Sequence, residues 1–276
     1  MGLAAISYDS PEILSSFSRQ HEITFPLLSD AGSATIKRYG IVNTVADAVI
    51  GPNRDDPAVA ADIKKYVSLV NPNAGMIGMA FPGTFIVDPD GRVKSRFFEA
   101  FYRERNTASS LMLTLGGRAG SVAGTQISTE HLEIKTYHTD AAVAFGNRFS
   151  VVVEITPRRG IHVYAPGAVG YRVIALTLAP QPFVRVLESQ YPASQIYFFK
   201  PLNERVPVYE GPFTLRRELL LESSPEAQAT LRGKDGLTLI GALNYQACDD
   251  RVCFNPASVP LSWTLTLQPL ITERPK

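Results

Sequence analysis

The two cysteines are the residues of this chain whose type and spacing most directly suggest chemistry. Cys248 and Cys253 lie five positions apart near the carboxyl end, and the 276-residue chain contains no others. Residues 249–252 are expected to form a loop that turns a strand back, and cysteines flanking so short a hairpin loop have their β-carbons close enough to bridge. The strand is predicted from a period-two alternation of apolar residues at Leu237, Leu239, Leu243 and Tyr245.

Three uses of the cysteine pair are open at this point. An exchange-active disulfide is favoured, because the chain-entropy model assigns only about 2 kcal/mol to so short a closed loop. A structural disulfide and unpaired or metal-binding thiols are the alternatives. A zinc site needs about four ligands, whereas no second cysteine pair exists and no ligand spacing is present in the histidines His131, His138 and His162. We therefore expect no metal.

Composition indicates a globular chain with two domains. The chain is 45% hydrophobic, and its 27 basic and 26 acidic residues give a net charge of +1. Such a balance gives no general reason to expect nucleic acid or an anionic membrane as a partner. No apolar run approaches the roughly 18 residues that a membrane span requires, and the first residues do not resemble a signal peptide.

The first part of the chain mixes strand and helix signals. A strand at residues 3–6 precedes Ser10-Pro11-Glu12, where Ser10 is expected to cap a helix that begins at Pro11. A second short helix is expected at about residues 33–39. Residues 84–87 and 92–98 are predicted to form a β-hairpin around the turn sequence DPDG, and a helix is expected at about residues 106–115.

The second part reads as strands only. Residues 116–128 are rich in small residues at their start and are predicted to be a linker. Beyond it, many short strands separated by Pro and Gly favour a β-sandwich over residues 129–276. The strands are expected at residues 149–155, 161–164, 173–178, 206–221, 237–245 and 259–267.

Residues 1–115 resemble the peroxiredoxin (AhpC/TSA) branch of the thioredoxin fold. Three motifs in the family's order carry this resemblance: AISYDSPE at 5–12, ITFPLLSD at 23–30 and FPGTFIVDPDG at 81–91. By resemblance, Pro82 occupies the place of a proline that is often cis and faces the reactive cysteine, although an ordinary loop proline is the alternative. The family's reactive-cysteine segment is missing, because no cysteine precedes Cys248. We therefore expect an incomplete α/β thioredoxin-like domain without peroxidase activity, either truncated or degenerate, with an exposed sheet edge.

Residues 130–268 resemble the immunoglobulin-like amino-terminal domain of the thiol:disulfide interchange protein DsbD. The matching stretches are ITPRRGIHVYAP at 155–166, VYEGPFTL at 208–215 and YQAC at 245–248 with Cys253. The resemblance implies that Cys248 and Cys253 are a redox pair. It further implies a shielding aromatic loop, for which the candidates are Tyr197, Phe198 and Phe199, and an active-site strand with His162 and Tyr164. Ordinary core packing of these five side chains is the alternative.

The function expected from these features is thiol:disulfide exchange with partner proteins, without an organic cofactor. Thioredoxin-like or other dithiol/disulfide proteins are the expected partners. The alternatives are a peroxiredoxin-type antioxidant enzyme encoded by a longer gene, and a non-enzymatic β-sandwich with a structural disulfide. The DsbD resemblance favours a bacterial extracytoplasmic, periplasmic location, with the cytoplasm as the alternative.

Overall fold

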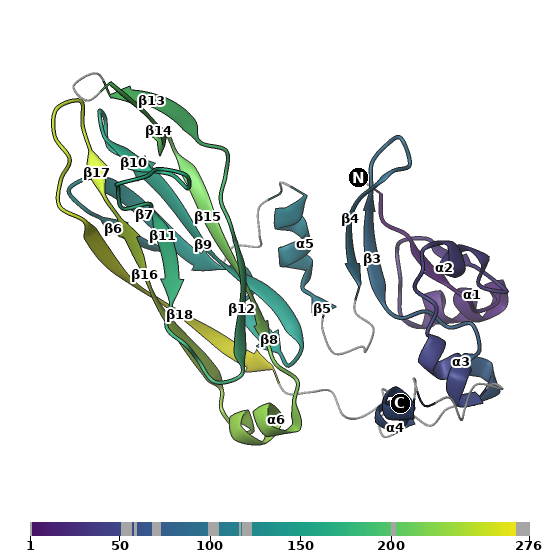
Figure 1. Ribbon diagram of the computed structural model, residues 1–276. Coiled ribbons are helices and arrows are strands. Elements are labelled where there is room, and N and C mark those ends of the chain that lie inside the picture. Colours follow the sequence, from purple (N-terminus) through teal and green to yellow (C-terminus); the bar gives the residue numbers. More distant parts are fainter. Residues whose placement is uncertain are drawn as a thin grey trace. The chain divides into compact units, whose positions relative to one another are not determined.

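The chain forms two compact units, residues Met1–Tyr102 and Arg103–Lys276. The computed structural model describes residues 2–50, 57, 60–67, 73–98, 105–115, 117, 123–199 and 203–268. The first unit contains both helices and strands, and strands dominate the second (Figure 1).

The first unit begins with a β–α–β arrangement. Strand β1 (Ala5–Ser7) pairs in parallel with β2 (Leu27–Ser29), and helix α1 (Pro11–Gln20) connects them. As expected, the Ser10 side chain accepts a hydrogen bond from the amide of Ile13, and Pro11 occupies the first turn of the helix.

Four further helices and a hairpin complete this unit. They are α2 (Ala34–Arg38), α3 (Thr44–Ile50), α4 (Ala60–Val67), the 3-10 helix η1 (Ala74–Met76), and strands β3 (Gly83–Val87) and β4 (Val93–Phe98). Asp88 holds the hairpin turn, because its carboxylate accepts hydrogen bonds from the amides of Asp90 and Arg92. The predicted hairpin is thus confirmed, with ends that differ from the prediction by one residue.

The described strands of this unit form small, open sheets. Among the described residues, β1–β2 and β3–β4 are two separate two-stranded sheets. Four apolar side chains of the β–α–β segment are between 47% and 57% exposed: Ile6, Ile13, Phe17 and Leu28. Part of the apolar surface of this unit is therefore exposed, as we expect from the sequence.

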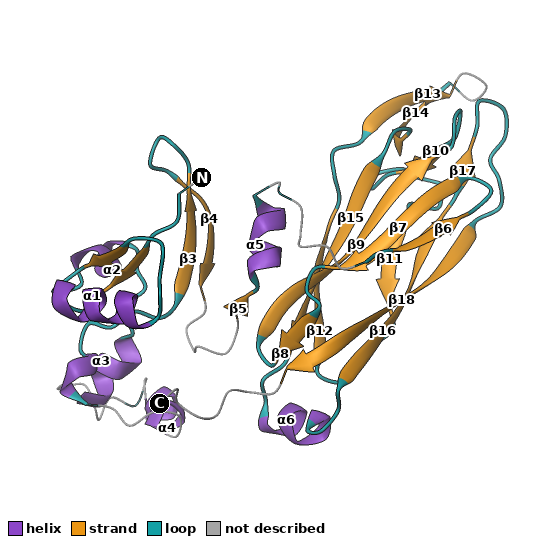
Figure 2. Ribbon diagram, turned by 180° about the vertical axis from the view of Figure 1, so that it is seen from behind, coloured by secondary structure: helices purple, strands orange, loops and turns teal. Residues whose placement is uncertain are grey.

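The second unit is a β-sandwich built from three sheets. A six-stranded sheet has the order β12-β15-β9-β7-β6 with β5 paired to β9, and two four-stranded sheets have the orders β11-β16-β18-β8 and β13-β14-β10-β17. Figure 2 shows the last sheet at the end of the unit opposite α6. The elements are β5 (Arg105–Asn106), α5 (Ala108–Thr114), β6 (Thr125–Ser128), β7 (Leu132–His138), β8 (Ala142–Ala144), β9 (Asn147–Pro157), β10 (His162–Tyr164), β11 (Ala175–Leu178), β12 (Val184–Gln190), β13 (Gln195–Phe199), β14 (Glu204–Tyr209), β15 (Phe213–Leu221), α6 (Pro225–Leu231), β16 (Gly236–Tyr245), β17 (Ala247–Cys248) and β18 (Ala257–Gln268).

Alternation along the strands places one apolar face in the core between the sheets. Strand β18 is the clearest case, because every second residue from Val259 to Leu265 is buried. Its Trp263 donates an indole hydrogen bond of 2.8 Å to the hydroxyl of Thr136 on β7, which belongs to the six-stranded sheet. This buried contact joins the facing sheets directly.

The border between the units differs from the predicted domain boundary. The Arg105 amide donates to the carbonyl of Gly146, and the Thr107 hydroxyl, which caps α5, donates to Asp140. Residues 105–115 therefore belong with the sandwich, whereas the prediction includes them in the first domain. Residues 125–128 of the predicted linker form β6, and most of residues 116–122 lie outside the described residues.

Candidate functional site

The cysteine pair lies where a strand passes from one sheet to another. Strand β16 ends at Tyr245 in the sheet with β18, and β17 continues it into the sheet with β10, where Cys248 pairs with His162. Cys248 and Cys253 form a disulfide with a Cα–Cα distance of 4.1 Å. The disulfide across a short hairpin loop is thus present as the sequence indicated.

The loop between the cysteines is organised by Asp249. Its carboxylate accepts hydrogen bonds of 2.8 Å and 2.7 Å from the amides of Arg251 and Val252, and its own amide donates to the Val252 carbonyl. These amides, Val252 first, lower the pKa of Asp249. Arg251 also contacts Asp250, but this pair is fully solvated and contributes little.

The two cysteines differ sharply in exposure. Cys248 is only 1% exposed and packs in a small apolar cluster with Tyr164, Val206 and Val208, whereas Cys253 is an exposed residue. Thiol–disulfide exchange requires that the attacking thiolate reach one of the two sulfurs. Of the two residues, Cys253 is the one that is open to solvent.

Tyr164 contacts both sulfur atoms. Its hydroxyl lies 3.1 Å from Cys248 Sγ and 3.2 Å from Cys253 Sγ. Because a disulfide sulfur has no proton, the hydroxyl is the donor in this state. Burial, and then the neighbouring Tyr171, raises the pKa of Tyr164, so the phenol stays protonated at neutral pH.

His162 lies beside the disulfide in a closed aromatic arrangement. Its ring stacks on Tyr197 with a tilted geometry at 4.4 Å and meets the edge of Tyr164 at 5.7 Å. Burial lowers the pKa of His162, and the carboxylates of Glu210 and Asp249 oppose this shift. The imidazole is therefore held in its neutral form.

The predicted shielding segment is strand β13, and only part of it covers the disulfide. Tyr197 packs on the Cys248 cluster and on His162. Phe198 points to the opposite face, is 42% exposed and lies under the guanidinium of Arg205 at 5.4 Å. Since side chains alternate along a strand, Tyr197 and the half-buried Phe199 share the face opposite to Phe198. Of these two, Tyr197 is the one that packs on the Cys248 cluster.

Two residues of the site had no signal in the sequence. The ring of Tyr171 stacks on Tyr164 with centroids 4.1 Å apart and planes 17° apart, and the Tyr171 hydroxyl donates a hydrogen bond to the carboxylate of Glu204. This hydrogen bond raises the pKa of Tyr171. Tyr171 lies in a loop and Glu204 begins β14, so neither belongs to a recognisable motif.

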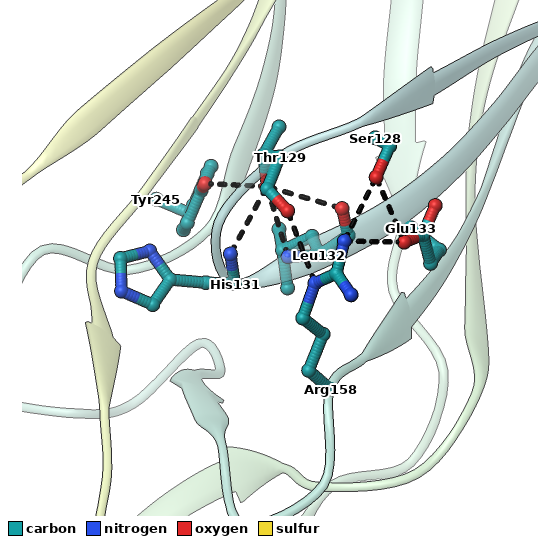
Figure 3. Close-up of polar contacts among 7 residues, drawn as sticks. All are labelled: Ser128, Thr129, His131, Leu132, Glu133, Arg158 and Tyr245. Atoms are coloured by element: carbon teal, nitrogen blue, oxygen red, sulfur yellow. Dashed lines mark hydrogen bonds and ion pairs between the residues drawn. The ribbon is translucent and has the colours of Figure 1, made fainter.

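A polar cluster supports the strand that leads to Cys248. The hydroxyl of Thr129, in the turn between β6 and β7, lies 3.3 Å from the Tyr245 hydroxyl and accepts from the amides of His131 and Leu132 (Figure 3). Arg158 donates to the Thr129 carbonyl and to the neighbouring side chains Ser128 and Glu133. These contacts hold the end of β16, and hence β17, in place.

His131, in the same turn, contacts the residue that follows the second cysteine. Its ring packs on Phe254, the residue after Cys253, with centroids 4.3 Å apart. Among the described residues, no group of three or more His, Cys, Asp or Glu side chains could hold a metal. His131 therefore reads as a packing residue.

Pro82 belongs to the first unit, which contains no cysteine. The Phe81–Pro82 peptide bond is trans. Phe81 is buried with Val45 and Ala46, which places this segment in the small core of the unit. Pro82 thus fits the alternative of an ordinary loop proline.

Comparison with known proteins finds a family match in the first part of the chain. Residues 2–96 match the AhpC/TSA family. The match covers less than half of the chain. It ends at residue 96, which precedes the sandwich and both cysteines. No curated protein matches the chain.

One similar solved structure is the crystal structure of the N-terminal periplasmic domain of ScsB from Proteus mirabilis. The similarity has a TM-score of 0.38 at 16% sequence identity and covers 52% of this chain and 51% of that one, so it spans about half of the neighbour's length. The sandwich assignment rests on the sheets and their register described above. Among the described residues, no helix is long and apolar enough to cross a membrane.

Proposed function

We propose that this chain is a thiol:disulfide oxidoreductase module whose Cys248–Cys253 pair exchanges electrons with partner proteins. The observation that carries the proposal is the asymmetry of the disulfide, since Cys253 is exposed and Cys248 is buried beneath a tyrosine that contacts both sulfurs. A disulfide with a purely structural role needs neither an exposed cysteine nor a hydroxyl that can donate a proton to one of its sulfurs.

The difference in exposure supports attack by a partner on Cys253 rather than on Cys248. A partner thiolate attacks Cys253 Sγ and forms a mixed disulfide, while the electron pair of the broken S–S bond goes to Cys248 Sγ. The partner's second thiol then attacks the partner sulfur of the mixed disulfide, so the partner leaves as a disulfide and Cys248 and Cys253 remain as a dithiol. In the reverse direction, Cys248 attacks Cys253 Sγ, the Cys248–Cys253 bond re-forms and the partner leaves as a thiol. Both directions use only the cysteines of the chain and of its partner, and the proposal needs no organic cofactor or metal.

The proposed partners are thioredoxin-like or other dithiol/disulfide proteins. Such proteins present an exposed, low-pKa cysteine that can reach Cys253. An extracytoplasmic location is proposed with this function, because disulfides persist in oxidising compartments. The AhpC/TSA match favours an antioxidant setting for the first unit, but peroxide reduction is not expected from residues 2–96, which contain no thiol.

Trapping of a mixed disulfide tests this proposal. In the Cys248→Ser variant, Cys253 activated as its mixed disulfide with 2-nitro-5-thiobenzoate should lose that thiol to a thioredoxin-like protein whose resolving cysteine is replaced by serine. The resulting covalent complex has no thiol that can resolve it and should be visible on a non-reducing gel. The matched Cys253→Ser variant leaves only the buried Cys248 and should trap much less. Equal trapping by the two variants, or none by either, contradicts the proposed direction of attack.

The equilibrium potential decides between exchange and a structural disulfide. An exchange-active pair must equilibrate with thioredoxin or glutathione couples. A pair that remains oxidised well below about −300 mV is a structural bond, and that result would refute the proposed function.

A further inference from the structure

The segment that carries Cys253 forms one edge of the sheet β13-β14-β10-β17. Strand β17 pairs with β10 on one side, and on the other side Cys248 forms an antiparallel bridge with Cys253. Two backbone hydrogen bonds flank this bridge, one of 2.9 Å from the Phe254 amide to the first carbonyl of β17 and one of 3.0 Å from the Asp249 amide to the Val252 carbonyl. The two cysteines are therefore a non-hydrogen-bonded pair of an antiparallel ladder.

This pairing turns the main chain of Cys253 outward. In a non-hydrogen-bonded pair, the N–H and C=O groups of the two residues point away from each other. Within the described part of the chain, neither the amide nor the carbonyl of Cys253 has a hydrogen-bond partner, and the residue is exposed. The edge thus offers one donor and one acceptor, the two groups by which a further strand joins a sheet.

The edge is held in a fixed conformation on both sides of the cysteine. Before it, the Asp249 carboxylate accepts a hydrogen bond of 2.7 Å from the Val252 amide. After it, the Phe254 carbonyl accepts a hydrogen bond of 3.1 Å from the Gln246 side chain, and the Phe254 ring packs on His131. Because the edge is ordered in advance, pairing with it costs less conformational entropy than pairing with a flexible loop.

The direction of attack on the disulfide leads to the same edge. The S–S bond runs across the ladder from Cys253 to Cys248 on β17. Displacement at a disulfide sulfur is in line, so the attacking thiolate approaches from the side opposite to the leaving sulfur. A thiolate that forms a bond to Cys253 Sγ, and sends the electron pair of the S–S bond to Cys248 Sγ, therefore arrives from the side away from β17. The free N–H and C=O of Cys253 face that side.

We propose that an exchange partner docks an extended main-chain segment, lying beside its reactive cysteine, along this edge as an added strand that hydrogen-bonds to the N–H and C=O of Cys253. The inference rests on the proposed function, because it names the way in which a partner is recognised at that cysteine. Recognition through the main chain does not depend on the side chains of the partner, so it fits any dithiol/disulfide protein that presents such a segment.

The test is the hydrogen exchange of the Cys253 amide in the covalent complex of the full-length Cys248→Ser variant with a thioredoxin-like protein whose resolving cysteine is replaced by serine. Cys253 is the single cysteine of this variant, so labelling with nitrogen-15 cysteine gives one amide signal in NMR spectra. The reference is the same variant with 2-mercaptoethanol on Cys253, which has the same kind of bond but no main chain. Nitrogen-15 tryptophan labels Trp263, the single tryptophan, as a control for the stability of the sandwich.

The amide of Cys253 should exchange at least about tenfold more slowly in the protein complex than in the reference, because a hydrogen-bonded amide exchanges only when the pairing opens. Its proton resonance should also move downfield, while exchange at Trp263 stays the same. Equal exchange of Cys253 in the two adducts refutes the added strand. Slower exchange without the downfield shift also refutes it, because the amide is then covered by the partner without being paired.

Failure of this inference is distinguishable from failure of the proposed function. A complex that forms but leaves the Cys253 amide unprotected overturns the added strand while partner exchange stands. A complex that does not form at all overturns the proposed function, and the added strand with it.

Discussion

Reduction of the Cys248–Cys253 disulfide should lower the stability of the sandwich only slightly. The two cysteines are five positions apart, and the chain-entropy model gives about 2 kcal/mol for a loop of that length. The entropy that the disulfide removes from the unfolded chain is small because the closed loop is short, and about 2 kcal/mol is the expected loss.

Urea unfolding followed by tryptophan fluorescence measures this effect in the sandwich alone. Trp263 is the single tryptophan of the chain and is buried between the facing sheets. For a slope of about 2 kcal/mol/M, the unfolding midpoint should fall by at most about 1 M on addition of reductant, with the slope unchanged. The Cys248→Ser/Cys253→Ser double variant is the control, since reductant should not affect its midpoint.

A larger effect would refute the reasoning. If reduction unfolds the protein without urea, or costs more than about 4 kcal/mol, the disulfide is a structural bond of the kind that small secreted domains need. If the pair alternates between dithiol and disulfide, the sandwich must stay folded when the disulfide is reduced.

Three further predictions follow from the site and the core. Tyr197→Ala should speed alkylation of reduced Cys248, whereas the outward-facing Phe198→Ala should not, and equal rates would show that β13 does not cover the sulfur. Because burial lowers the pKa of His162, the unfolded chain binds more protons below about pH 6.5, so stability should fall as the pH drops through that value. The fall should be smaller in His162→Gln, and an identical fall in both proteins would contradict it. Thr136→Val leaves the buried indole N–H of Trp263 unpaired and should cost about 1–3 kcal/mol in thermal or urea unfolding; a loss below about 0.5 kcal/mol would mean that the indole finds another partner.

Local signals in the sequence predicted most elements and the position of the chemistry. Ser10 and Pro11 start α1, Asp88 holds the β3–β4 turn, and alternation marks β18. The missed elements include strands β2, β6, β7, β8, β12 and β13 and helices α3, α4 and α6, whose patterns are short or interrupted. Helix α5 was expected at the right place but assigned to the other unit, since its packing on β9 involves residues distant in sequence.

The sequence by itself determined that two cysteines flank a tight hairpin loop and lie close enough to bridge, because that geometry depends on six consecutive residues. Only the tertiary structure decided which cysteine is exposed, that Tyr197 rather than Phe198 covers the other, and that Tyr171 stacks on Tyr164 and donates a hydrogen bond to Glu204. The physical reason is that these contacts join β17, β10, β13, β14 and a separate loop. Strand order and register bring such segments together, and neither is encoded in the spacing of residues along any one of them.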